Sequence, residues 1–157
     1  MESAMIRVIL CVPVLAALLV LGTRLCADDK KTPAGEDKHA MFTECAKACD
    51  DCARSCDTCA THCAKLIADG HKHHLATLKT CDDCAALCRA ASCVVSKQGP
   101  FSDIACRACA DACKKCGDAC EQHGGDDPVM KACTAECRKC EKACWEMLKH
   151  LGPGGDK

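Results

Sequence analysis

The stretch CAKACDDCARSCDTCATHC, from Cys45 to Cys63, decides the fold of this chain. Its six cysteines recur in alternating steps of four and three residues, the period of one face of an α-helix. Only Ala and polar residues stand between them, so this segment has no second apolar face. A core-facing helical stripe normally carries Leu and Ile, whereas here the stripe that must face the core consists of thiols.

Similar stripes recur three more times along the chain. Nineteen of the 21 cysteines follow residue 40, and all of these except Cys93 keep steps of three or four within their segment. Turn residues such as Gly99-Pro100 and Asp127-Pro128 separate the segments, which predicts helices near 38–68, 72–96, 102–122 and 128–150. The cysteines are Cys45, Cys49, Cys52, Cys56, Cys59, Cys63, Cys81, Cys84, Cys88, Cys93, Cys106, Cys109, Cys113, Cys116, Cys120, Cys133, Cys137, Cys140 and Cys144.

The short connections place consecutive helices antiparallel to one another. The sequence therefore predicts an all-α fold, an antiparallel up-down-up-down four-helix bundle with a Cys-lined core. The near-heptad period also favours a left-handed supercoil. In such a bundle the four thiol stripes converge on the axis.

The chain is expected to have four regions. An apolar run over 8–21 is too short to span a bilayer comfortably and is typical of a signal peptide, which we place at 1–27. A disordered linker at 28–37, the bundle at 38–151 and a disordered tail at 152–157 follow. We therefore expect an exported protein, periplasmic or secreted, with no membrane attachment after signal removal. An uncleaved membrane anchor is the alternative.

The charge balance and the aromatic content argue against a nucleic-acid partner. The chain has 21 Lys and Arg against 22 Asp and Glu, and its only Phe, Trp or Tyr residues are Phe42, Phe101 and Trp145. It lacks both a basic patch and the aromatic platforms that stack bases. No nucleophile–base pair or phosphate-binding loop is visible, and a thiol oxidoreductase needs one exposed, activated pair rather than many equivalent ones. The sequence thus indicates a protein that is not an enzyme.

Disulfides are the usual explanation for so many cysteines in a secreted chain. Helix geometry argues against them within a stripe, since positions i and i+4 hold their Cβ atoms roughly 5–6 Å apart and a disulfide needs about 3.5–4.5 Å. Two opposed metal–sulfur bonds span about 4.6 Å, so a metal ion can fill the gap. Bridges between facing helices are compatible with this geometry, and a disulfide-stapled structural secreted protein remains an alternative.

The stripes therefore predict a site made of soft ligands, and thiolates select Cu(I), Zn²⁺ or iron–sulfur clusters. A tetrathiolate zinc site carries a net negative charge that a narrow apolar bundle would bury repeatedly. Cu(I) is univalent, accepts two or three sulfurs, and at about one ion per cysteine brings the core near neutrality. Iron–sulfur ligation uses a few spaced cysteines rather than helical ladders. Multiple Cu(I) ions per chain fit best, and a zinc- or cadmium-buffering, metallothionein-like protein is the alternative.

CxxxC and CxxC spacing recurs on all four predicted helices, as in Cys52-Ala-Arg-Ser-Cys56, Cys109-Ala-Asp-Ala-Cys113, Cys116-Gly-Asp-Ala-Cys120 and Cys140-Glu-Lys-Ala-Cys144. Over about 40–150 the chain resembles the copper storage proteins, the Cys-rich four-helix bundle copper-binding family. The resemblance implies that inward cysteines bind many Cu(I) ions for storage and detoxification, and that bundles can form homo-oligomers. It makes all nineteen cysteines candidate metal ligands. Cys93, five residues after Cys88, departs from the pattern.

The two ends of the predicted bundle differ in composition. One end is rich in imidazole, and the candidates there for a mouth that admits metal are His62, His74, His123 and Met130. The last three of these continue the thiol stripes toward the opening. The opposite end is bulkier and more apolar, and we expect Phe42, Phe101 and Trp145 to block it. Met41 and Met147 also lie there, either as ordinary core residues or as an alternative entrance.

Overall fold

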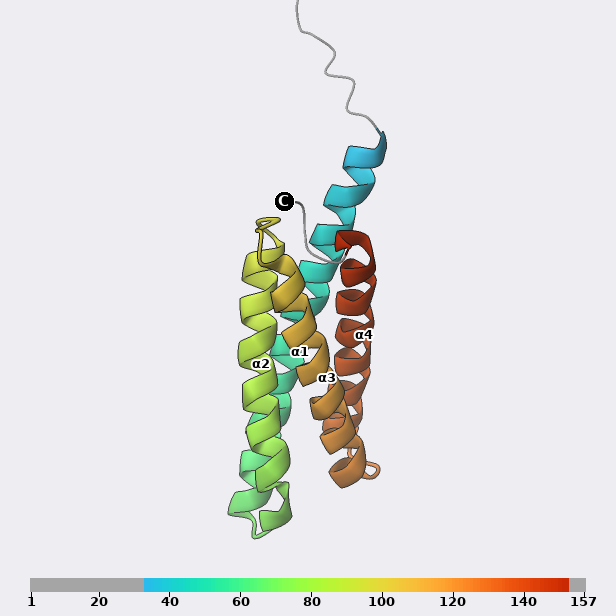
Figure 1. Cartoon of the computed structure of the whole chain (residues 1–157). Coiled ribbons are helices and arrows are strands. Elements are labelled where there is room, and N and C mark those ends of the chain that lie inside the picture. Colours follow the sequence, from blue (N-terminus) through green and yellow to red (C-terminus); the bar gives the residue numbers. More distant parts are fainter. Residues whose placement is uncertain (1–32, 153–157) are drawn as a thin grey trace, which may run out of the picture. The chain divides into compact units, whose positions relative to one another are not determined.

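The computed structural model describes residues 33–152, and these residues form helices and turns without any strand (Figure 1). The helices are α1 (Pro33–Ala68), α2 (Leu75–Val95), α3 (Ser102–Gly124) and α4 (Pro128–Leu151), and a 3₁₀ turn η1 (Lys72–His74) directly precedes α2. α1 packs against α2 and α4, and α3 packs against the same two helices. The predicted four-helix bundle is confirmed.

Turn residues set the helix ends close to the predicted positions. Gly70, which follows α1, has a φ of 99°, a left-handed conformation that favours glycine. Asp127 begins α4, because its Oδ1 accepts hydrogen bonds from the backbone N–H groups of Val129 and Met130 at 2.9 and 3.0 Å. Pro128 follows in the first turn, where its missing N–H has no consequence. These connections reverse the chain between successive helices.

α1 begins earlier than predicted. Residues 33–37 are helical, although we expected all of 28–37 to be a disordered linker. Pro33 suits the first turn of a helix because its φ is already helical. The signal peptide expected at 1–27, the first part of the linker and residues 153–157 of the tail lie outside the described residues. Within 33–152 no helix carries an apolar stretch long enough to cross a bilayer.

The space between the helices is filled mainly by small side chains. Cysteines and alanines make up most of the buried set in the middle of the bundle. Larger buried side chains lie toward the ends, with Phe42, Val95 and Met147 at one end and Met130 at the other. The structure therefore positions thiols along the axis, with larger apolar side chains near its ends.

Candidate metal centre

Eighteen of the nineteen cysteines in the described residues are buried, each at most 2% exposed. Six come from α1, three from α2, five from α3 and four from α4. Steps of three and four residues hold each stripe on one face of its helix, and that face points to the bundle axis. The sulfurs consequently form one continuous column.

The sulfurs of α1 and α3 meet across the axis in five rungs, with Sγ–Sγ distances of 3.7 to 3.9 Å. Residue numbers rise together on both helices from one rung to the next. α1 and α3 therefore run in the same direction, as diagonal helices of an up-down-up-down bundle must. The rungs are Cys45 with Cys106, Cys49 with Cys109, Cys52 with Cys113, Cys56 with Cys116, and Cys59 with Cys120.

Thiols from α2 and α4 extend the rungs into groups of four sulfurs that lie within 4.8 Å of one another. In the group of Cys49, Cys109, Cys140 and Cys144, four of the Sγ–Sγ distances are 3.7 or 3.8 Å. Three sulfurs about 3.8 Å apart leave a central point about 2.2 Å from each, close to a metal–thiolate bond of roughly 2.3 Å. Further groups are Cys52, Cys84, Cys88 and Cys113; Cys52, Cys56, Cys84 and Cys137; Cys56, Cys116, Cys133 and Cys137; and Cys59, Cys81, Cys120 and Cys133.

All nineteen cysteines of the described residues are free thiols. Cys88 and Cys109, on facing helices, have their sulfurs 3.5 Å apart, far longer than the roughly 2.05 Å of an S–S bond. Cys52 and Cys56, one turn apart on α1, have theirs 3.9 Å apart. The thiols are thus in van der Waals contact, an arrangement that suits shared metal ligands rather than covalent staples.

Burial and mutual contact shift the acidity of these thiols in both directions. Burial is the main reason why the pKa of Cys63 is raised. The pKa of Cys120 is lowered to about 5, chiefly because Cys116 hydrogen-bonds to its sulfur. The pKa of Cys116 is raised in turn, first by that same contact with Cys120. One thiolate is stabilised by neighbours that keep their protons, so the column can lose all its protons only when cations replace them.

Cys93 does not belong to the sulfur column. It is exposed on α2, and its Sγ lies 3.3 Å from Nζ of Lys97. Five residues separate it from Cys88, and five steps of about 100° carry it about 140° around the helix from the stripe. Of the nineteen candidate ligands, Cys93, which already departed from the spacing, is the one that the structure does not bring into the core.

His74 lies at the centre of the histidine-rich end. Its side chain is buried, with 7% of the residue exposed. Burial lowers its pKa, and charge on the surrounding imidazoles lowers it further, so His74 is neutral at neutral pH. A neutral imidazole has a lone pair with which it can bind a metal ion. The surrounding imidazoles are those of His73, His71, His123 and His62.

Two other residues of the predicted mouth are already engaged. Nε2 of His62 lies 2.7 Å from Oδ2 of Asp127, the residue whose other carboxylate oxygen caps α4. Met130 is fully buried and packs against Gly124, where even a Cβ atom would lie 2.7 Å from the Met130 side chain. From the sequence, Asp127 is expected only to begin a helix. Its hydrogen bond with His62 joins α1 to α4, and no local sequence signal indicates it.

The opposite end is more open than predicted. Phe42 is buried, but Phe101 and Trp145 are 65% and 37% exposed, so the prediction that three aromatic side chains block this end is wrong. Phe101 precedes α3 at its N-cap, and Trp145 follows Cys144 on α4, one step of about 100° off the inward stripe. A groove of about 140 Å³ between α1 and α4 reaches the first core thiol there. It is lined by Met41, Glu44, Cys45, Ala143, Glu146, Met147 and His150.

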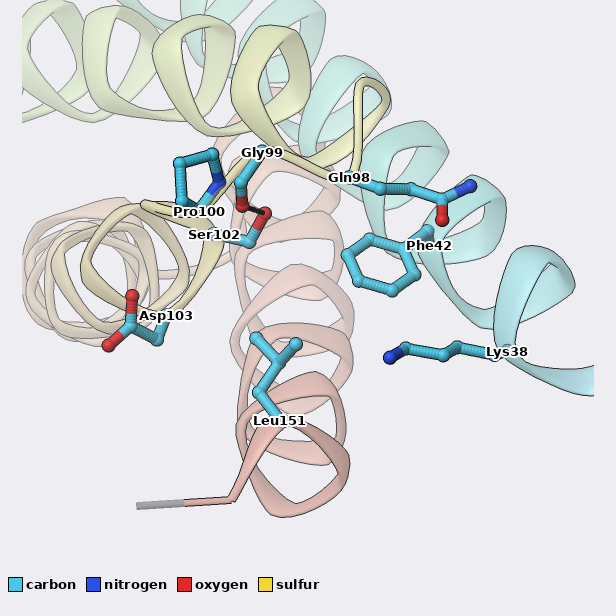
Figure 2. Close-up of a pocket in the computed structure, with 8 residues that line it drawn as sticks. All are labelled: Lys38, Phe42, Gln98, Gly99, Pro100, Ser102, Asp103 and Leu151. Carbon is cyan, nitrogen blue, oxygen red and sulfur yellow. Dashed lines mark hydrogen bonds between the residues drawn. The ribbon is translucent and has the colours of Figure 1, made fainter. Parts of the chain in front are cut away.

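A second hollow at this end contains no sulfur (Figure 2). Its volume is about 260 Å³, and Phe42 and Leu151 line it together with Lys38 and Asp103. Ser102 is also part of the lining, and its Oγ donates a hydrogen bond of 2.6 Å to the Gly99 carbonyl. Because its lining offers no soft ligand, this hollow is separate from the metal centre.

Solved structures of copper storage proteins resemble this bundle. One is a cytosolic copper storage protein from Streptomyces lividans with five coppers, which is 33% identical with a TM-score of 0.67 over 75% of this chain and 100% of that chain. The Cu(I)-bound copper storage protein BsCsp3 is 32% identical with a TM-score of 0.60 over 68% of this chain and 98% of that chain. The Streptomyces lividans protein loaded with 10 copper equivalents is 33% identical with a TM-score of 0.62 over 70% of this chain and 85% of that chain. No curated protein matches the chain significantly.

These similar structures correct the expectation of export. The protein from Streptomyces lividans is described as cytosolic, and the prediction of a periplasmic or secreted protein is wrong by this comparison. The apolar run over 8–21, on which that prediction depended, lies outside the described residues. A short apolar run is a weak signal because its composition alone specifies neither cleavage nor export. The homo-oligomer and the lack of a nucleic-acid partner stay predictions.

The sequence itself also matches a family. The family described as copper storage protein (Csp) matches residues 36–149. That segment includes every stripe, from Cys45 to Cys144, and hence every four-sulfur group in the bundle. The family match, the sulfur column and the similar solved structures agree. This chain belongs to the copper storage protein family.

Proposed function

We propose that this protein stores multiple Cu(I) ions, which the eighteen buried thiolates of the core bind. The unbroken column of four-sulfur groups carries this proposal, because each group offers soft ligands at the spacing of metal–thiolate bonds. Similar proteins with five and with 10 coppers support it. Copper is cargo here, so the proposed role in storage and detoxification requires no catalytic group.

The charge of the buried core favours Cu(I) over a divalent ion. Each thiolate that loses its proton leaves a negative charge in a space lined by Cys and Ala. One univalent ion per thiolate restores neutrality, whereas zinc bound by four thiolates leaves an excess of negative charge at every site. Shared thiolates in van der Waals contact also suit ions of low coordination number.

A Cu(I) titration of the reduced protein against a competing chelator tests this function. Free thiols are counted before and after reduction. We expect more than about ten ions per chain, because about one ion per thiolate keeps the core near neutral. A plateau at one or two ions would contradict the proposal, and few free thiols before reduction would favour the disulfide-stapled protein. Zinc that displaces bound copper at a comparable free concentration would favour the zinc- or cadmium-buffering alternative.

We also propose that copper enters at the histidine-rich end, through His74 and His123. His74 is neutral, buried and surrounded by other imidazoles, and it lies two turns before Cys81 on the same stripe. His62 is available only when it leaves Asp127, and Met130 lies deeper. The groove beside Cys45 is the competing entrance.

Uptake kinetics distinguish the two entrances. Replacing His74 and His123 with Ala should slow loading from a Cu(I) chelate and leave the final capacity nearly unchanged, because the sulfur column is intact. The matched variant replaces Met41 and Met147 with Ala and should load at the normal rate. Slowing in the methionine variant alone would place the entrance at the groove beside Cys45.

A further inference from the structure

The turn between α1 and α2 gathers three imidazoles outside the sulfur column. His71, His73 and His74 lie within four consecutive residues, and η1 folds them back on one another. The ring centres of His73 and His74 are 4.0 Å apart. His71 lies 6.1 Å from His73 and 6.5 Å from His74, with its ring steeply inclined to both. Nothing in the proposed storage of Cu(I) by thiolates uses His71 or His73.

His74 carries a buried polar atom that has no partner. Its Nδ1 is inaccessible to solvent and makes no hydrogen bond within the described residues. Leaving a buried nitrogen without a hydrogen-bond partner is unfavourable, and a bound ion is one arrangement that would satisfy such an atom. The pKa of His74 is lowered, first by burial and then by the neighbouring imidazoles, which keeps the ring neutral and free to accept a metal ion.

The ring spacing fits a shared ion. A metal bound at 2.0–2.1 Å from a ring nitrogen lies about 3.2 Å from the ring centre. Two rings that share it then have centres about 4.5 to 6.4 Å apart, depending on the angle at the metal. The three observed separations, 4.0, 6.1 and 6.5 Å, come within about half an ångström of this range. The rings of His71 and His73 are exposed, so their side chains can turn toward a shared ion without disturbing the core.

We infer that His71, His73 and His74 form a second metal site, which binds one divalent first-row ion independently of the thiolate core. Nitrogen donors suit Cu²⁺, Ni²⁺ and Zn²⁺, whereas the sulfur donors of the core suit Cu(I). Among the divalent ions, Cu²⁺ binds such donors most tightly. The protein therefore offers two kinds of site that separate copper by oxidation state.

Electron paramagnetic resonance on protein first saturated with Cu(I) under argon tests this site. Cu(I) is silent in this measurement and occupies the thiols, so added Cu²⁺ reports only on the remaining ligands. We expect one bound Cu²⁺ per chain with hyperfine splitting from imidazole nitrogens. Replacing His71 and His73 with Ala, two exposed side chains whose loss spares the core, should weaken this binding at least tenfold.

The control replaces His39 and His150 with Ala, two exposed histidines at the opposite end of the bundle. This variant should bind Cu²⁺ as the parent does. Absence of a nitrogen-coordinated Cu²⁺ signal, or equal binding by the His71 and His73 variant, would overturn the inference. The Cu(I) count is measured beforehand on the same sample, so failure of the histidine site leaves the test of copper storage unaffected.

Discussion

Removing one buried thiol should reduce copper capacity, whereas removing the exposed one should not. Cys113 lies in the middle of the column, where its sulfur is 3.7 Å from Cys52, 3.9 Å from Cys84 and 3.6 Å from Cys88. Cys93 is exposed and touches none of these sulfurs within hydrogen-bonding distance. The two substitutions, Cys113→Ala and Cys93→Ala, delete the same atom in opposite environments.

The expected loss of copper capacity follows from how the thiolates are shared between ions. With about one ion per thiolate and two or three sulfurs per ion, each sulfur bridges two or three ions. Cys113→Ala therefore weakens two or three ions at once and should lower capacity by about one or two. The same substitution should lower the free energy of unfolding of the apo protein by roughly 1 kcal/mol, since it removes one small buried group. Cys113→Ser keeps the volume and separates the lost ligand from the lost packing.

Capacity is read from Cu(I) titration against a chelator and from native mass spectrometry of the loaded protein. Cys93→Ala should retain the full number of ions. Equal losses in the two variants would refute the reasoning, because they would mean that burial in the column does not define the copper ligands. Full capacity in Cys113→Ala would refute it as well.

Three further outcomes follow from the same structure. Copper loading should raise Tm in calorimetry by more than about 20 °C, because each ion held at a free concentration of about 1,000 Kd adds about 4 kcal/mol; coincident melting of the apo and loaded forms would place copper outside the core. Cu(I) affinity should fall by about tenfold per pH unit for each proton released, between about pH 8 and about pH 6. The raised pKa of Cys63 keeps its thiol protonated, so copper must displace that proton. A chelator competition that is independent of pH would contradict this. Asp127→Ala should destabilise the apo bundle by about 1 kcal/mol in urea unfolding, because it removes the cap of α4, and Asp127→Asn should cost less.

The cysteine period predicted the fold well because one residue type marks the core face of all four helices. Any slip of phase would place a thiol outside, and the five-residue step to Cys93 does this. The prediction that Phe101 and Trp145 help to close one end was wrong because it assumed that large apolar side chains lie inside. Phe101 and Trp145 remain exposed because Phe101 caps the start of α3 and Trp145 lies off the inward stripe of α4.

The histidine-rich end was harder to predict for a different reason. The sequence shows that His62, His74 and His123 belong to one end, but their states depend on contacts between helices. His62 is held by Asp127, which lies 65 residues away along the chain. His74 is buried with a free nitrogen. A pattern of spacing carries no information on such pairings, because they arise only after the helices are packed.

The distribution of large side chains explains how a bundle can hold together with so few of them. Burial of apolar surface contributes in proportion to area, so small Cys and Ala side chains supply little each. Phe42, Val95 and Met147 form a larger apolar layer at one end, and Met130 with the partly buried Leu66 and Leu78 forms another at the other end. These layers fix the helices where the sulfur column stops, which leaves every central position available for a thiol. Copper then supplies to the centre the cohesion that Leu and Ile provide in other bundles, so storage capacity and stability of the loaded protein rise together.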